Sequence, residues 1–336
     1  MTQPRHDDTK VVQALDAMMG GIAFLVSYDL KLFEVLGRGS QTASQLAAAL
    51  GIGERPAEAL LSVAAAQGFV HCSNDTYQLT PTAEEYLLPE SPTYYGPMID
   101  LRMAAMPVYT FEALKNSVLN DIPQAYGGRD VFAGNAADSS RAQVFTRAMH
   151  SRSMAAALAW PKLRDLSGHR RLLDIGGGSG AHSIGAALQW PQLAATVLDI
   201  APVCLIAAQY VAAERLSERI HTLPSDMFDD PFPSADVHFY GNVYHDWPAE
   251  KCRFLTGKSY GALPSGGRLV IHEMLYDNDK NGPLEAAVYS VVMLLWQRGR
   301  QYSGAELTRM LTEAGFIEIE VKRSFGLWSI VCGRKA

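Results

Sequence analysis

The first forty residues carry an apolar pattern with the period of an α-helix. Apolar side chains recur at helical spacing from Val11 onward, which predicts two helical segments over residues 8–38, interrupted at Gly20-Gly21. The second segment, residues 22–36, is apolar on nearly every side, so we expect it to be buried.

The longest apolar run of this region, residues 17–26, is shorter than the roughly 20 residues that span a bilayer. An alternative is a secretory signal, but Asp7 and Asp8 precede the run where a signal carries positive charge. The sequence therefore predicts no membrane segment.

Signals for helix, turn, helix and hairpin follow. Ser40 or Thr42 caps a short helix that ends at Gly51. A second helix covers about residues 55–67, and two short strands flank residues 73–75. This order predicts a winged helix, a module that often binds DNA.

The second of these helices argues against DNA binding. It holds one arginine, Arg55, and no lysine, asparagine or glutamine before Gln67, so base edges and phosphates would find few donors. The whole chain has 29 Lys+Arg against 35 Asp+Glu and a net charge of -6, which gives no general attraction to nucleic acid. We expect no nucleic-acid partner.

A run rich in Pro, Ser and Tyr, residues 88–96, predicts a linker, and helical patterns follow over residues 98–120 and 142–166. After Gly168, strands alternate with helices, which predicts an α/β domain with a parallel sheet wound on both faces. Its helices are predicted to begin at Gly180 and to cover residues 203–220, 248–263, 284–296 and 304–314, before two final strands at 316–323 and 327–334.

With 336 residues and 48% hydrophobic side chains, the composition is that of a soluble globular protein. We expect an N-terminal mainly α domain over residues 1–96, a helical linker over 97–166 and the α/β domain over 167–336. The four cysteines form no CxxC pair and no cluster of ligand residues has metal-binding spacing, so the sequence predicts no metal and a reducing, cytoplasmic location.

The first predicted strand of the α/β domain ends in a glycine-rich turn. Gly176, Gly178 and Ala181 fit a dinucleotide-binding pattern. Asp174 argues against a dinucleotide, because a carboxylate there repels a pyrophosphate but suits the ammonium of S-adenosylmethionine. Asp199 ends the next strand and can accept hydrogen bonds from both ribose hydroxyls of either cofactor.

The end of the third predicted strand suits an adenine ring. Asp226 can accept from the adenine amino group while Met227 and Phe228 hold the ring; the alternative is a loop acid before two core residues. Because three successive strand ends suit one adenosine, we predict that S-adenosylmethionine and its product S-adenosyl-L-homocysteine bind here. Neighbouring strand-end residues complete the predicted cofactor site: Ile200, Ser225 and Asn242.

His245 follows the fourth predicted strand. The alternatives are a structural histidine and, for Asp246, the N-cap of the helix that Pro248 opens. At the carboxyl end of a parallel strand, however, a neutral imidazole with a pKa near its reference value of about 6.5 can remove the proton of a hydroxyl whose oxygen attacks a sulfonium methyl. We therefore predict that His245 is a general base.

The motifs DIGGGSG, LD, SDMF and YHDW and the closing helix-helix-strand-strand segment resemble those of the S-adenosylmethionine-dependent small-molecule O-methyltransferases, which include plant caffeate-type and bacterial antibiotic-tailoring enzymes. The resemblance covers nearly the whole chain. It implies a class I methyltransferase Rossmann-like sheet with an antiparallel last strand. It also implies that the winged helix is a dimerisation module and that the helices beside it complete the partner's acceptor pocket.

The resemblance also assigns the catalytic residues. The family base falls on His245, and one of the two acids that bracket it falls on Glu273. The other falls on Gln301, where the family usually has glutamate, and a lysine that often lies four residues before the base falls on Gly241. These departures point to an acceptor other than a simple catechol-like phenol, with Gln301 acting through hydrogen bonds.

Segments that the family uses for its acceptor pocket supply five candidates, although residues at this spacing are often core: Phe145, Met149, Met154, Met293 and Trp296. They imply an apolar, aromatic acceptor. Four arginines are candidates for binding an acceptor carboxylate, although each alone is expected to be solvated: Arg147, Arg152, Arg298 and Arg300.

The leading hypothesis is a homodimeric enzyme that methylates a hydroxyl of a small aromatic metabolite. A second hypothesis is methylation of carbon or nitrogen, or a cofactor-dependent reaction without methyl transfer, and Gln301 keeps it open. A third, from another class, is a winged-helix transcription regulator that senses S-adenosylmethionine.

Overall fold

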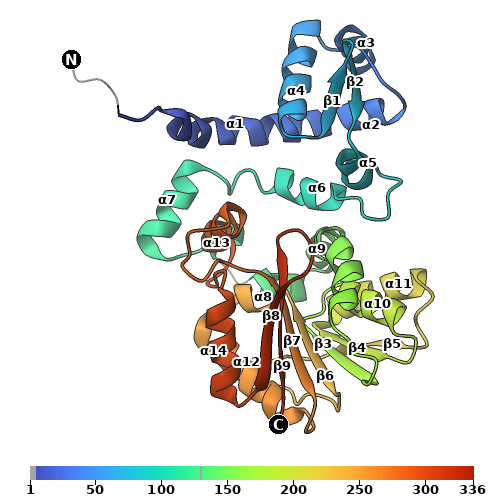
Figure 1. Cartoon of the computed structure of the whole chain (residues 1–336), viewed down its shortest axis with the longest axis vertical. Helices are drawn as coiled ribbons and strands as arrows, with labels where there is room; N and C mark the ends of the chain where they lie inside the picture. Colours follow the sequence, from blue (N-terminus) through green and yellow to red (C-terminus); the bar gives the residue numbers. More distant parts are fainter. Residues whose placement is uncertain (1–4, 129–130) are drawn as a thin grey trace. The chain divides into compact units, whose positions relative to one another are not determined.

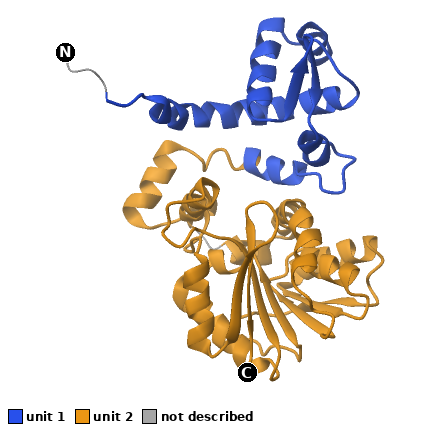
Figure 2. Ribbon diagram, in the orientation of Figure 1, with its two compact units in different colours: residues 1–103 blue, residues 104–336 orange. Residues whose placement is uncertain are grey.

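The computed structural model describes residues 5–128 and 131–336. The chain divides into two compact units, residues 1–103 and 104–336 (Figure 2). The first unit is mainly helical with a small hairpin, and the second contains a seven-stranded sheet.

The local signals predicted for the first unit are confirmed. Thr42 caps α3 through a reciprocal capping box with Gln45, and Gly51 ends that helix in the left-handed conformation. The hairpin turns at Asn74 and Asp75, both of which have positive φ, as a two-residue turn requires. The elements are α1 (Thr9–Asp29), α2 (Leu32–Gly37), α3 (Ala43–Leu50), α4 (Glu54–Ala66), β1 (Val70–Ser73), β2 (Thr76–Leu79), α5 (Pro81–Leu87) and α6 (Gly96–Ala104), as labelled in Figure 1.

The predicted interruption at Gly20-Gly21 is wrong, because α1 runs through both glycines and the chain bends instead at Lys31, whose φ is 66°. A glycine inside a helix costs only about 1 kcal/mol relative to alanine, which packing can offset. Gln67 Nε2 donates to the Gly20 carbonyl at 2.9 Å. A Cβ at Gly20 would lie 3.3 Å from that nitrogen, so the glycine permits this close contact.

The N-terminal part of α1 is exposed in this chain, whereas residues 22–36, for which burial was expected, are mostly buried or half-buried. Val11, Leu15 and Met18 keep 63%, 70% and 68% of their surface exposed. By length and composition the 21 residues of α1 could also cross a membrane, although the apolar run of residues 17–26 on which the prediction was based is shorter. One such helix is weak evidence for a membrane span, because core helices of soluble proteins and N-terminal signal sequences have similar length and composition.

Helices precede the sheet in the second unit: α7 (Phe111–Asn120), α8 (Val131–Ala137), α9 (Ser139–Ala159) and the 3₁₀ helix η2 (Trp160–Leu163). The single helix predicted over residues 98–120 is in fact two helices, α6 and α7. Pro107 lies between them and lacks the backbone N–H that a helix interior needs, and Thr110 caps α7.

The strand order of the sheet is β5-β4-β3-β6-β7-β9-β8. The first five strands of this order are parallel to one another, whereas β9 is antiparallel to both β7 and β8 (Figure 1). The predicted α/β class and the antiparallel last strand are therefore confirmed. The strands are β3 (Arg171–Ile175), β4 (Ala194–Asp199), β5 (Ile220–Pro224), β6 (Val237–Gly241), β7 (Arg268–Met274), β8 (Ile317–Arg323) and β9 (Trp328–Arg334).

Alternate residues of the buried strands face two helical layers. Leu172 and Val197 pack in the cluster that includes α10 and α11, whereas Leu173 and Leu198 pack in the cluster that includes α12 and α14. The sheet is thus wound on both faces, and the carboxyl ends of its parallel strands meet at one edge. The helices are α10 (Ala181–Gln189), α11 (Ala201–Ala213), α12 (Ala249–Ala262), α13 (Leu284–Trp296) and α14 (Gly304–Ala314).

One predicted helix is too long. The pattern predicts a helix over residues 203–220, but α11 ends at Ala213 and Arg215 has a positive φ of 59°. Ile220 already pairs with Ala195 in the sheet. Its apolar side chain continues the helical pattern although the residue belongs to a strand.

Candidate active site

The turn between β3 and α10 brings its backbone close to neighbouring elements. Gly176, Gly178 and Gly180 have φ of 65°, 57° and 76°, a region that other residues rarely adopt. A Cβ at Gly176 would lie 2.9 Å from Val243 Cγ2, and the Gly176 N–H donates to the Leu198 carbonyl at 2.8 Å. Only glycine fits this position without displacing its neighbour.

Asp174 is fully buried near the end of β3. Ser183 Oγ donates to Oδ2 at 2.7 Å, whereas Oδ1 has no hydrogen-bond partner among the described residues. Burial, assisted by the charge of Asp199, raises the pKa of Asp174 to about 7. Asn242, with a left-handed φ of 61° just after β6, also has a buried Oδ1 without a partner in the described part of the chain. Buried acceptors of this kind indicate a place for a ligand donor.

Asp199 links the glycine turn to the end of β4. Its Oδ2 accepts from the Gly178 N–H at 2.9 Å and its Oδ1 from the Ile200 N–H at 2.8 Å. Burial raises the pKa of Asp199 to about 6, and the two amides oppose that rise. Because an ionised carboxylate offers about four lone-pair positions, each oxygen can still accept from a ribose hydroxyl.

Asp226, in the loop after β5, forms hydrogen bonds with the backbone of that loop. Asp226 Oδ1 accepts from the Phe228 N–H at 2.7 Å and the Asp229 N–H at 3.3 Å. Ser225 Oγ donates to Asp230 Oδ2 at 3.0 Å. The predicted cofactor residues Ser225 and Asp226 therefore also shape the backbone of this loop.

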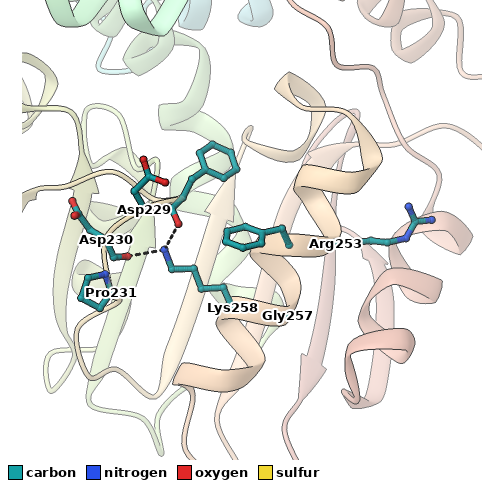
Figure 3. Close-up of a pocket in the computed structure, with 8 residues that line it drawn as sticks. Asp229, Asp230, Pro231, Arg253, Gly257 and Lys258 are labelled. Carbon is teal, nitrogen blue, oxygen red and sulfur yellow. Dashed lines mark hydrogen bonds between the residues drawn. The ribbon is translucent and has the colours of Figure 1, made fainter.

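Lys258 of α12 binds the same loop from its carbonyl side. Its Nζ donates to the Phe228 carbonyl at 3.0 Å and the Asp230 carbonyl at 2.6 Å (Figure 3). Beside this contact lies a surface pocket lined by Phe228, Asp229, Asp230, Pro231, Arg253, Phe254, Gly257 and Lys258. The lysine fixes the loop rather than presenting a free cation to the pocket.

Met227 and Phe228 pack against different elements. Met227 Sδ would lie 3.9 Å from a Cβ at Gly176, so it faces the glycine turn. The Phe228 ring meets Trp247 edge-on with centroids 4.9 Å apart. The structure thus places Met227 next to the glycine turn and the Phe228 ring next to Trp247.

His245 lies in the short 3₁₀ helix η3 (Tyr244–Asp246) and is buried. Its Nδ1 lies 2.6 Å from Glu273 Oε2 at the end of β7. Because an ionised carboxylate only accepts, the imidazole proton belongs on Nδ1 and the lone pair on Nε2. Nε2 is 3.4 Å from the Tyr289 hydroxyl and 3.6 Å from Asp246 Oδ1.

The charges around His245 favour its protonated form. Burial alone would lower its pKa, but the carboxylates of Glu273 and Asp246 outweigh burial, and the pKa is raised above the ordinary value. The charge of Arg152 acts in the opposite direction. The imidazole can therefore stabilise a proton that it takes from a hydroxyl.

Gln301 is buried beside the segment of the base. Its backbone N–H donates to Ser290 Oγ of α13 at 3.3 Å, and its side-chain Nε2 has no partner among the described residues. Two residues earlier, a Cβ at Gly299 would overlap the His245 carbonyl, so Gly299 packs against the backbone of the base. The Gln301 amide is a donor that a ligand oxygen can use.

Packing explains why residue 241, where the family often has lysine, is a glycine in this chain. A Cβ there would lie 2.5 Å from His182 Cδ2, so the imidazole occupies the space that a longer side chain would need. His182 is buried 5.0 Å from both Phe239 and His272 by ring centroids, and burial lowers its pKa to about 3. The described residues hold no group of three or more His, Cys, Asp or Glu side chains placed for a metal ion.

Three of the five acceptor-pocket candidates lie together. Phe145 packs on the cluster that contains Met293 and Trp296, and Trp296 Nε1 donates to the Tyr109 hydroxyl at 2.7 Å. Tyr289, which contacts His245, joins the same cluster. The structure thus brings aromatic side chains next to the predicted base.

The other two candidates lie apart from this cluster. Met154 packs with Ala157 and Ala181 between α9 and α10, which is a core position. Met149 is half-buried and belongs to none of the clusters formed by the described residues. Helical spacing alone did not distinguish residues near the base from residues of the core.

Tyr289 is not among the residues predicted for the site, and the expectation that Arg152, a candidate for binding an acceptor carboxylate, is solvated is wrong. Arg152 is buried, with 9% of its surface exposed, and its guanidinium lies over the Tyr289 ring. A signal was present for both residues. Arg152 lies seven residues after Phe145 and Tyr289 lies seven before Trp296, so each shares a helix face with a pocket candidate.

Solved structures of methyltransferases have this fold. Human N-acetylserotonin methyltransferase in complex with S-adenosylmethionine matches with a TM-score of 0.82 and 24% identity over 100% of both chains. A mitomycin 7-O-methyltransferase matches with a TM-score of 0.74 and 25% identity over 98% of both chains. The chain therefore has a methyltransferase fold, with the glycine turn and acidic strand ends described above.

Sequence comparisons define the family. The O-methyltransferase dimerisation domain matches residues 12–89 and the O-methyltransferase domain matches residues 111–317. The 3-hydroxy-5-methyl-1-naphthoate 3-O-methyltransferase of Streptomyces sahachiroi is 37% identical over 91% of this chain and 89% of its own length. The L-tyrosine C(3)-methyltransferase of Streptomyces lavendulae is 31% identical over 86% of this chain and 81% of its own. The chain belongs to the O-methyltransferase family and is an enzyme.

Proposed function

We propose that this enzyme transfers a methyl group from S-adenosylmethionine to a hydroxyl of a small aromatic secondary metabolite, with His245 as general base. The observation that carries the proposal is the 2.6 Å contact of Nδ1 with Glu273, which leaves Nε2 to take a proton. The aromatic cluster of Phe145, Trp296 and Tyr289 supports a flat, apolar acceptor. The naphthoate 3-O-methyltransferase relative supports the same class.

The strand ends fit the cofactor. Asp174 Oδ1 is a buried carboxylate oxygen without a partner among the described residues, and the ammonium of the methionine moiety is the type of donor that it lacks. We assign Asp199 to the ribose hydroxyls, and Asp226, with Met227 and Phe228, to the adenine ring. When bound, S-adenosylmethionine supplies a methyl group activated by positive sulfur.

The chain's own residues position the acceptor and handle its proton. The acceptor hydroxyl gives its proton to His245 Nε2 while Nδ1–H donates to Glu273, which stabilises the imidazolium. The Gln301 amide can donate to the acceptor oxygen or another polar atom of the acceptor without adding charge. Orientation of the acceptor oxygen toward the methyl group supplies much of the remaining rate enhancement.

A second candidate function is methylation of an aromatic carbon. The L-tyrosine C(3)-methyltransferase relative favours it, because that protein acts on a ring carbon by name. Gln301 in place of the usual glutamate favours it as well. In this reaction the methylated ring carbon loses its proton, either directly or after the neighbouring phenol has lost one. His245 would still be the base that takes the proton.

The same proposal covers assembly and location. We infer a cytoplasmic homodimer in which the exposed apolar face of α1 packs on a partner chain rather than on lipid, supported by the dimerisation domain over residues 12–89. We infer no role in DNA binding, because the helix α4 carries Arg55 as its one basic residue.

A methyl-transfer assay tests the function. The purified enzyme is incubated with methyl-labelled S-adenosylmethionine and a panel of hydroxylated benzenes, naphthalenes and quinones, and products are analysed by mass spectrometry and NMR. We expect a methoxy product from at least one aromatic hydroxyl. A ring-methyl product would support the second candidate instead, and binding of NADH in preference to S-adenosylmethionine would contradict both.

A further inference from the structure

The ammonium group of Lys258 lies against the carbonyl side of the loop that follows β5. Its Nζ donates to the carbonyls of Met227, Phe228 and Asp230 at 2.7, 3.0 and 2.6 Å. An ammonium has three N–H donors, so these carbonyls use all of them. Nζ also lies 4.3 Å from the centroid of the Phe232 ring. Each of these contacts is with residues 227–232, so the side chain of Lys258 binds one loop.

Aspartate side chains of the loop hold its amide side. Asp226 Oδ1 accepts from the N–H groups of Phe228 and Asp229. Asp230 Oδ2 accepts from the Asp226 N–H at 2.8 Å. The amides are therefore bonded within the loop, whereas the carbonyls are bonded by Lys258 from α12.

The part of α12 that carries Lys258 is fixed to the sheet. Leu255 and Ser259, on either side of the lysine in sequence, are fully buried. Ser259 Oγ lies 2.7 Å from the hydroxyl of Tyr240 in β6, and each hydroxyl can donate to the other. Lys258 thus connects the loop to a rigid element, and the position of the loop depends on that connection.

The charge of Lys258 offsets the charge of the loop. Three carboxylates lie close together in the chain, at Asp226, Asp229 and Asp230, and like charges at short distance repel one another. Burial lowers the pKa of Lys258, and the charges of these aspartates oppose that change. Replacing the lysine with a neutral residue would remove both the positive charge and the hydrogen bonds to the carbonyls.

We propose that Lys258 is a positioning residue for the cofactor, because it holds the loop in the shape that presents Asp226 to the adenine amino group. This inference rests on the proposed function, which places the adenine at this loop. Two amides occupy Oδ1 of Asp226, which leaves Oδ2 to accept from an amino group. The same oxygen repels the 6-oxo group of a hypoxanthine base. Lys258 therefore acts through Asp226 to select adenine, and it does not touch the cofactor.

A pair of ligands that differ at the 6-position of the purine tests this selection. Binding of S-adenosyl-L-homocysteine and S-inosyl-L-homocysteine to the whole enzyme is measured by calorimetry. We expect the wild type to bind the adenosyl compound at least tenfold more tightly, because a site built to accept from an amino group rejects an analogue that lacks it. Equal binding of the two compounds would overturn the proposal without any variant.

Variants at residue 258 show whether the lysine sets this preference. Lys258→Met should weaken binding of S-adenosyl-L-homocysteine by roughly 5- to 30-fold and bring the ratio of the two affinities to within about threefold of one. Lys258→Arg, whose guanidinium can still donate to carbonyls, should retain part of the ratio. If Lys258→Met fails to fold in a thermal melt, Lys258→Gln takes its place. A folded neutral variant with the wild-type ratio would overturn the proposal.

Lys251→Met is the matched control. Lys251 is a second lysine of α12, and its Nζ lies 4.6 Å from the Phe228 ring centroid and 4.2 Å from that of Trp247. The variant removes the same charge from the same helix but leaves the carbonyl contacts of Lys258 in place. We expect it to keep the ratio of the two affinities. A loss equal to that in Lys258→Met would assign the effect to charge in general and overturn the role of the carbonyl contacts.

Kinetics separate positioning of the cofactor from proton chemistry. In Lys258→Met the KM for S-adenosylmethionine should rise while kcat at saturation stays within about threefold of the wild type, because His245 and Glu273 lie on other elements. A fall in kcat at unchanged KM would overturn the proposal.

Failure of this inference is distinguishable from failure of the proposed function, because the binding measurements need no acceptor. If base selection depends on Lys258 but no methyl group is transferred to any acceptor, the positioning role stands and the proposed reaction falls. If an aromatic hydroxyl is methylated but the wild type binds both homocysteine compounds equally, the reaction stands and the positioning role falls.

Discussion

At the scale of single residues, the proton chemistry of the site depends on the environment of one imidazole. His245 is buried, yet Glu273 at 2.6 Å and Asp246 at 3.6 Å raise its pKa rather than lower it. Glu273 also fixes which ring nitrogen carries the proton. The lone pair of His245 is therefore on Nε2, the nitrogen that lies beside the Tyr289 hydroxyl.

Replacement of His245 by alanine should lower kcat by about 10²- to 10⁴-fold, the usual contribution of general-base catalysis. Affinity for S-adenosylmethionine should change little, because Asp174, Asp199 and Asp226 remain. Single-turnover methyl transfer and calorimetry measure the two quantities. A turnover within about threefold of the wild type would show that His245 does not remove the proton.

The charges around His245 determine how kcat/KM changes with pH. His245 must be neutral to act as a base, so kcat/KM should rise with pH and level off above a midpoint higher than the ordinary histidine pKa of about 6.5. Glu273→Gln removes a charge that raises this pKa and leaves burial, which lowers it, so the midpoint should move to lower pH. The exposed Glu285→Gln is the control and should leave the midpoint in place. A midpoint unmoved or raised by Glu273→Gln would contradict the assignment.

At the scale of elements, the glycine turn after β3 is the most constrained segment of the site. Its glycines have positive φ, and Asp199 fastens the Gly178 N–H to the end of β4. Two glycines differ in their surroundings. A Cβ at Gly176 would lie 2.9 Å from Val243, whereas a Cβ at Gly178 would meet nothing within 4 Å.

This difference predicts unequal effects of alanine. Gly178→Ala should cost about 1–2 kcal/mol of unfolding free energy, the cost of the left-handed conformation alone. Gly176→Ala should cost about 1–3 kcal/mol more through the contact with Val243, and it should also weaken cofactor binding. Denaturant melts and calorimetry on both variants check this order, and equal losses in the two variants would contradict the role of the close contact.

At the scale of the whole molecule, the apolar face of α1 is the feature that a single chain leaves exposed. Leu15 and Met18 keep most of their surface in solvent, within the matched dimerisation domain. Exposed apolar patches of this kind mark protein interfaces or membrane contacts. The family model favours a second copy of the chain over lipid.

We therefore expect a dimer at micromolar concentration by light scattering, recovered in the soluble fraction and not bound to vesicles. Leu15→Glu should weaken the dimer by roughly 30-fold or more, as loss of an interface anchor does. The control is Leu205→Glu on α11, which is 71% exposed in the other unit and should leave the dimer intact. This assignment would be contradicted if the wild type were a monomer, if it sedimented with vesicles, or if it shifted the mobility of DNA in a gel in a salt-dependent way.

The sequence by itself determined the class of the fold and the identity of the strand-end residues. Alternation of strands with helices, the glycine turn and the acids Asp174 and Asp199 are local patterns, and local patterns depend on residues adjacent in the chain. The caps at Thr42 and Gly51 and the turn at Asn74-Asp75 belong to the same class.

Features that depend on contacts between residues distant in the sequence became clear only from the tertiary structure. The continuity of α1 through its two glycines and the early end of α11 depend on contacts with Gln67 and on the pairing of Ile220. In the site, the spacing from Phe145 indicates the helix face of Arg152, but the contact of its guanidinium with Tyr289, more than a hundred residues away in the chain, depends on packing between helices. Propensity and periodicity predict which residues share one face of a helix or strand. Burial and charge environment depend on packing between elements that are distant in sequence.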